Sequence, residues 1–108
     1  MDKQQESKKR QVKLGPVEKI PLGQGICFVV DKEEIAVFRP RTGGLFAVHN
    51  RCPHRQGPLC DGVVDERQVV CPYHGHKFDL RTGIDNEAGR KVKVYEIREE
   101  NGEIFLEV

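Results

Sequence analysis

Hydrophobic residues occur in short runs, separated by polar and turn-forming residues, from Val17 to the end of the chain. The runs are rich in β-branched and aromatic side chains, which are typical of β-strands. No segment keeps an apolar period of 3.6 residues, so the pattern predicts no long helix. The expected strands are residues 26–30, 35–38, 45–48, 67–70, 77–80, 92–97 and 103–108.

Two pairs of these strands are joined by sequences that favour β-hairpins. Residues 31–34 are polar and separate two hydrophobic runs, and Asn101-Gly102 is a strong signal for a tight hairpin turn. After that turn, the alternating positions Ile104, Leu106 and Val108 predict one buried face on the last strand. The chain is therefore expected to form an all-β fold of antiparallel strands.

The first residues of the chain differ from the rest in composition. Residues 1–13 carry five Lys or Arg against two acidic residues and offer almost nothing to bury. Such a segment is typical of a solvated, flexible terminus. We expect a flexible polar tail over residues 1–13 and a single domain over residues 14–108.

Length, charge and composition exclude several classes of function. A chain of 108 residues holds one small domain, and its formal net charge of +1 argues against a nucleic-acid binder that neutralises phosphates. No apolar run approaches the roughly 20 residues of a membrane span, and the first residues lack the apolar stretch of a secretory signal. We therefore expect a cytoplasmic protein with reduced thiols, in which clustered cysteines hold metal more often than they form disulfides.

Half of the cysteines and histidines form a paired motif, in which 16 residues separate Cys52-x-His54 from Cys71-x-x-His74. A structural zinc site can use the same four residues, but its usual spacing pairs Cys with Cys and His with His. Here each half of the motif contains one Cys and one His. This arrangement fits a two-iron cluster better, because one iron can take both thiolates and the other both imidazoles. A third interpretation, four unrelated buried residues, is disfavoured by the regular offsets.

The sequence around this motif resembles the Rieske [2Fe–2S] family. The resemblance covers residues 17–108 and is carried by residues 45–59 (LFAVHNRCPHRQGPL) and 70–83 (VCPYHGHKFDLRTG). Within the family the chain is most similar to the small subunits of assimilatory NAD(P)H-dependent nitrite reductases, at residues 35–39, 50–54 and 57–64. Ferredoxins of ring-hydroxylating dioxygenases share the ligand motifs. The resemblance implies an antiparallel β-sandwich with a small cluster-binding subdomain formed by two loops.

The implied function is transfer of one electron at a time. Cys52 and Cys71 would hold one iron, and His54 and His74 the other. The chain shows no nucleophile–base pair and no substrate-binding fingerprint, so it is expected to be the electron-transfer subunit of an oxidoreductase. Its partner would be a large reductase subunit with flavin, sirohaem and a further iron–sulfur cluster, or the oxygenase and reductase of a dioxygenase system. A zinc-stapled structural module is the alternative of another class.

Differences from the Rieske proteins of cytochrome bc complexes predict a low reduction potential. Those relatives join the two loops by a disulfide, whose partners would fall at Gly57 and Tyr73 here. They also carry hydroxyl side chains at the positions of His76 and Phe78. Donors near the sulfur atoms stabilise the reduced cluster, so their absence lowers the potential.

The other cysteines and histidines lie outside the ligand spacing. We expect them to be scaffold residues, with small packed thiols among them. They are Cys27, Cys60, His49 and His76.

Overall fold

The computed structural model describes residues 10–51, 58–65, 67–71, 77–85 and 89–108. These residues form nine strands and two single turns of 3₁₀-helix. The strands are β1 (Gln11–Pro16), β2 (Gln24–Val30), β3 (Glu33–Arg39), β4 (Phe46–His49), β5 (Val63–Asp65), β6 (Gln68–Val70), β7 (Lys77–Asp79), β8 (Val94–Glu100) and β9 (Glu103–Glu107). The 3₁₀ turns are η2 (Val17–Lys19) and η3 (Leu59–Asp61). No helix in this part of the chain is long and apolar enough to cross a membrane.

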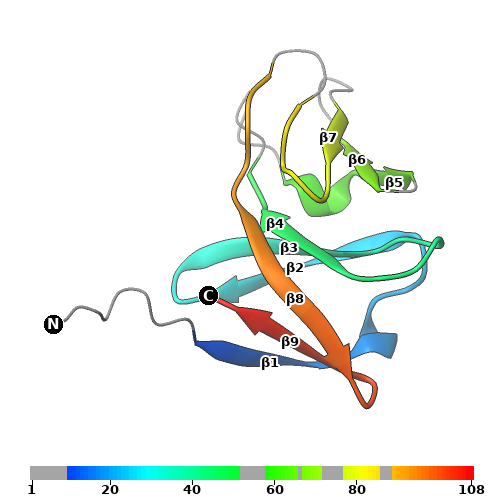
Figure 1. Ribbon diagram of the computed structural model, residues 1–108, viewed down its shortest axis with the longest axis vertical. Coiled ribbons are helices and arrows are strands. Elements are labelled where there is room, and N and C mark those ends of the chain that lie inside the picture. Colours follow the sequence, from blue (N-terminus) through cyan, green and yellow to red (C-terminus); the bar gives the residue numbers. More distant parts are fainter. Residues whose placement is uncertain (1–9, 52–57, 66, 72–76, 86–88) are drawn as a thin grey trace, which may run out of the picture.

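The strands form two antiparallel sheets, which confirms the predicted fold class. The larger sheet has the order β1-β9-β8-β4-β3-β2 and curls on itself, and the smaller one has the order β5-β6-β7 (Figure 1). β4 and β8 are neighbours in the large sheet, pairing Val48 with Val94. Everything between these two strands is therefore an insertion that leaves the large sheet at one place and returns to it there. We call residues 50–93 the tip subdomain.

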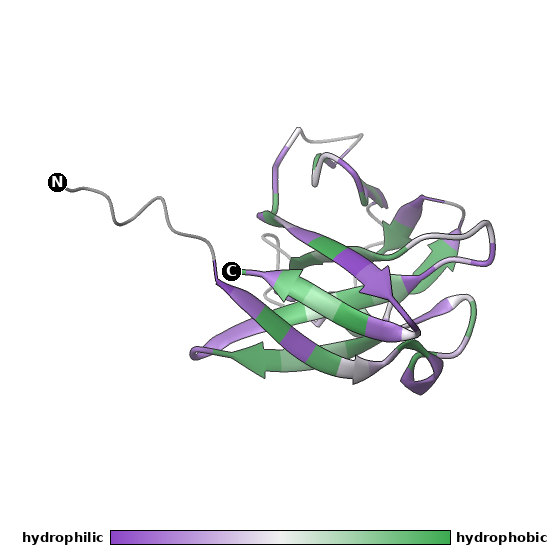
Figure 2. Ribbon diagram, turned by 60° about the horizontal axis from the view of Figure 1, so that its bottom comes forward, coloured by the Kyte–Doolittle hydropathy of each residue, from purple (hydrophilic) through white to green (hydrophobic). Residues whose placement is uncertain are grey.

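Strand β3 is buried on both faces over residues 35–38, which explains the uninterrupted apolar run there. Ile35 and Val37 face the core of the curled sheet, whereas Ala36 and Phe38 face a second core beneath the small sheet. All four side chains are fully buried. Along residues 11–14 of β1, by contrast, exposed polar residues alternate with half-buried hydrophobic ones (Figure 2).

Both predicted hairpins are present, and their turns have the expected backbone. Asp31 and Lys32 join β2 to β3 with φ of 52° and 70°. Asn101 and Gly102 join β8 to β9 with φ of 54° and 78°. Two consecutive left-handed residues match the right-handed twist of the flanking strands.

Residues 11–13 lie in a strand, although the composition predicted a flexible tail over residues 1–13. Strand β1 begins at Gln11 and pairs with β9 along its whole length, so the prediction is wrong for residues 11–13. A bulge between Lys13 and Gly15, where Gly15 has a φ of 115°, interrupts the alternation that would have revealed this strand. Residues 1–9 lie outside the described part of the chain.

Candidate metal centre

The first predicted ligand loop is closed at its base by the backbone. It leaves β4 through Asn50 and Arg51 and ends at Pro58, which forms an isolated β-bridge with Arg51. The Leu59 amide donates to the Asn50 carbonyl over 2.6 Å. The chain then enters η3, so both ends of this loop are anchored on ordered backbone.

The second predicted loop is the connection of a hairpin. It begins at Cys71, directly after β6, and ends at Lys77, where β7 begins. Val70 and Lys77 are paired across the two strands, which brings the loop ends together.

The ends of the two loops share one hydrophobic core. Leu59 follows the first loop, Cys71 begins the second and Phe78 follows the second. Leu59 and Phe78 are fully buried, and Cys71 is 1% exposed. The two loops therefore start from the same end of the molecule, as a site built from both of them requires.

Of the four predicted ligands, Cys71 is the one that the structure describes, and Cys52, His54 and His74 lie outside the described residues. Cys71 carries a free thiol, and its position at a strand end beside the hairpin loop suits a ligand. Within the described ranges no three His, Cys, Asp or Glu side chains gather into a metal-binding group. The four-residue ligand set stays a prediction.

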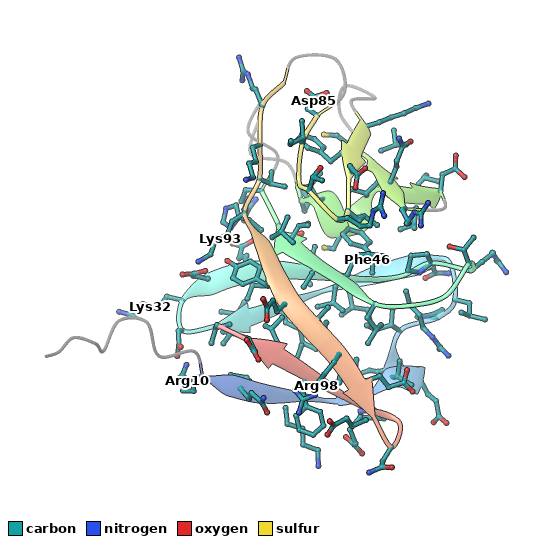
Figure 3. The ribbon with its side chains drawn as sticks, viewed as in Figure 1. Arg10, Lys32, Phe46, Asp85, Lys93 and Arg98 are labelled. Atoms are coloured by element: carbon teal, nitrogen blue, oxygen red, sulfur yellow. The ribbon has the colours of Figure 1, made fainter. Side chains whose placement is uncertain are left out.

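A third segment of the tip subdomain pairs with β7 directly after the second predicted loop. Residues 84 and 85 form bridges with Lys91 and Phe78, and the Asp85 amide donates to the Arg90 carbonyl over 2.8 Å. Asp85 is 1% exposed and lies at the far end of the tip subdomain (Figure 3). The turn before it is held by Asp79, whose Oδ1 accepts from the amides of Arg81 and Thr82 over 2.8 Å and 3.3 Å.

Sequence reasoning missed the role of Asn50, a buried polar residue two positions before Cys52. Its side chain is 1% exposed and joins three segments of the chain. Its Nδ2 donates to Cys27 Sγ over 3.3 Å and to Glu34 Oε1 over 3.2 Å, and its Oδ1 accepts from the Cys60 amide over 2.9 Å. The sequence shows only that Asn50 is a polar residue at the end of a predicted strand, and this pattern does not indicate which groups it contacts.

The scaffold cysteines lie close together beside Asn50. Cys27 on β2 and Cys60 in η3 are both half-buried, and Cys60 packs against the tip core. Burial, and then the neighbouring Cys27 thiol, raise the pKa of Cys60 to about 11, so this thiol stays protonated at neutral pH. His49 is half-buried at the end of β4, and His76 lies outside the described residues.

Comparison with known proteins identifies the family of this arrangement. The family model of the Rieske-like [2Fe-2S] domain matches residues 11–107. The chain is 34% identical over 97 residues to the anthranilate 1,2-dioxygenase ferredoxin subunit of Burkholderia cepacia, covering 88% of this chain and 89% of that protein. It is 40% identical over 85 residues to the 4beta-methylsterol monooxygenase of Methylococcus capsulatus, which covers 68% of this chain but only 23% of the larger protein.

Solved structures share the fold. A protein of Mycobacterium tuberculosis named as an NADH-dependent nitrite reductase small subunit superposes with a TM-score of 0.88 at 23% identity, covering 94% of this chain and 97% of that one. The ferredoxin of carbazole 1,9a-dioxygenase from Nocardioides aromaticivorans gives a TM-score of 0.80 at 27% identity, covering 89% and 95%. The shared core at the ends of the two predicted loops, the all-β fold and the family match together establish that the chain belongs to the Rieske-like [2Fe–2S] domain family and is an electron carrier with a Rieske-type cluster.

Proposed function

We propose that Cys52 and Cys71 bind one iron of the cluster and that His54 and His74 bind the other. The observation that carries this proposal is the burial of Cys71 in the same core as Leu59 and Phe78, at the base of both loops. Two thiolates and two imidazoles are the donor set of a Rieske centre, which supplies one-electron transfer. The chain's own part is to hold the four donors and to keep water from the base of the loops.

Substitution of each predicted ligand tests the assignment against a matched control. Cys52→Ser, Cys71→Ser, His54→Ala and His74→Ala should each abolish the Rieske electron paramagnetic resonance signal of the dithionite-reduced protein. Cys60→Ser and His49→Ala change the same residue types outside the motif and should keep the signal. A colourless parent protein with stoichiometric zinc would contradict the proposal.

We further propose that the carrier is a cytoplasmic small subunit of an assimilatory NAD(P)H-dependent nitrite reductase. The residues that support this are those at 35–39, 50–54 and 57–64. The protein from Mycobacterium tuberculosis adds a likeness of fold over 94% of the chain. The partner would be a large subunit with flavin and sirohaem, on which the substrate chemistry takes place.

A second candidate is the ferredoxin of a ring-hydroxylating dioxygenase system. It is favoured by the 34% identity to the anthranilate 1,2-dioxygenase ferredoxin subunit, most of whose length the chain spans. Size-exclusion chromatography of the tagged chain, expressed in its own host, distinguishes the two. A stable stoichiometric complex that contains sirohaem supports the reductase subunit. A chain that elutes alone, and is reduced by a separate flavoprotein, supports the ferredoxin.

We also propose that the cluster has a potential near the bottom of the Rieske range of roughly −150 to +300 mV. Phe78 supports a low potential, because it is fully buried in the apolar core that it shares with Leu59 and Cys71 and has no hydroxyl to donate. Protein-film voltammetry should give a midpoint below zero, and a midpoint well above zero would contradict the reasoning.

A further inference from the structure

We propose that Glu34 is a positioning residue whose carboxylate, acting through Asn50 and Arg51, fixes the first ligand loop on strand β3. The inference rests on the proposed assignment of Cys52 and His54 as ligands, and it adds to that assignment a residue far from the motif in sequence.

The Glu34 carboxylate uses both of its oxygens on the start of the loop. Oε1 accepts from Asn50 Nδ2 over 3.2 Å, and Oε2 accepts from Arg51 Nη2 over 2.8 Å. The Glu34 main-chain carbonyl also accepts from the Asn50 amide over 2.9 Å. One residue of β3 thus holds the two residues that directly precede Cys52.

Asn50 carries this restraint to the other end of the loop. Its Oδ1 accepts from the Cys60 amide, and its carbonyl accepts from the Leu59 amide. Because Asn50 is 1% exposed, these groups have no competing solvent. The start and the end of loop 51–58 are therefore tied to each other and, through Glu34, to the large sheet.

The charge of Glu34 suits this role at neutral pH. Hydrogen bonds from Arg51 and then from Asn50 hold the pKa of the Glu34 carboxyl below its usual value. Arg51, the residue directly before Cys52, is thus paired with a carboxylate, and neutralising that carboxylate alone would leave the cation without this partner.

The preceding residue supplies a matched control. Glu33 is also a glutamate of β3, but its carboxylate accepts from the Tyr95 hydroxyl, whereas that of Glu34 accepts from Asn50 and Arg51. Glu33→Gln and Glu34→Gln therefore remove the same charge from consecutive positions. Only the second removes a carboxylate that is hydrogen-bonded to the start of the loop.

The test compares these variants in the reduced and oxidised whole protein. We expect Glu34→Gln to change the g values of the electron paramagnetic resonance signal, to raise the midpoint potential more than Glu33→Gln does, and to speed cluster loss severalfold. Equal potential shifts in the two variants, with unchanged g values and cluster lifetime, would overturn the positioning role, because general charge would then account for the effect.

A reciprocal swap separates positioning from simple loss of stability. Asn50→Asp places a carboxylate against that of Glu34 and should alter the same three observables. Combining it with Glu34→Gln lets the introduced amide donate to the introduced carboxylate, so the double variant should return toward the parent. Additive damage would overturn the proposal. A parent protein without any Rieske signal would overturn the proposed function as well, which is a distinguishable result.

Discussion

Gly62 lies between η3, the turn that follows the first predicted loop, and strand β5. Its substitution by alanine tests the packing of the tip subdomain. The φ of Gly62 is −78°, which any residue adopts. A Cβ built there lies 2.2 Å from the Val70 carbonyl oxygen, 3.0 Å from Val69 Cγ2 and 3.1 Å from the Leu59 carbonyl oxygen. Two of these neighbours are backbone atoms, so a change of side-chain rotamer cannot relieve the crowding.

The size of the effect follows from two opposing contributions. Removing a glycine restricts the unfolded chain and would by itself stabilise the protein by about 0.4–1 kcal/mol. Relieving the contact requires the Val70 backbone to move by about 1 Å, and crowding of this kind costs about 1–3 kcal/mol. We expect a net loss of about 1–2 kcal/mol, which in a domain of this size lowers the Tm by about 5–15 °C.

Thermal denaturation followed by circular dichroism measures this loss of stability. The iron content of the purified protein shows whether the change also affects the cluster site. Val70 directly precedes Cys71, so Gly62→Ala should also lower the iron bound per chain. Gly102→Ala is the control, because Gly102 has a φ of 78° but no atom within 4 Å of a built Cβ. It should lose stability and keep its iron. An unchanged or higher Tm in Gly62→Ala would refute the reasoning.

Three further expectations concern separate parts of the molecule. Ile104→Val should lower the unfolding free energy in urea by about 1 kcal/mol, since Ile104 is fully buried; no loss would mean that the core relaxes around the change. Cys60 should be alkylated slowly at pH 8 and faster as the pH approaches about 11, as its raised pKa requires, and a rate like that of an exposed thiol would contradict this. Burial, followed by the Glu33 carboxylate, raises the pKa of Tyr95, so its stabilisation is complete below the ordinary tyrosine pKa of about 10 and declines above it. Tyr95→Phe should therefore flatten the fall of the unfolding free energy above pH 10, and an unaltered slope would be the contrary result.

Most of the fold could be predicted from local patterns, because a strand with one or two buried faces imposes its own sequence. The Asn101-Gly102 turn needs residues that accept positive φ, and the apolar run of β3 reflects burial on both sides. The failures fall where local rules are interrupted. Gly15 introduces a bulge that cuts short the alternation of β1, and β5 is three residues long with Val63 exposed, so neither strand shows a pattern long enough to predict it.

The candidate site was also predicted only in part. Its ligands could be predicted from the sequence, whereas the residues that support them could not. Only a few side chains ligate iron, so Cys52-x-His54 and Cys71-x-x-His74 predict a centre from their types and spacing alone. A supporting residue needs only a donor or acceptor in the right place, and many side chains provide one.

Glu33 and Glu34 make the point directly, because the sequence presents them as two equal glutamates at a polar turn. Alternation along β3 sends one carboxylate to Tyr95 and the other to Asn50 and Arg51. Their partners lie 62, 16 and 17 residues away, so the difference arises only once β3 has paired with its neighbours. The hydrogen bonds of Asn50 and Arg51 to the large sheet therefore depend on strand register, and a shift of β3 by one residue would exchange the two carboxylates and remove those bonds.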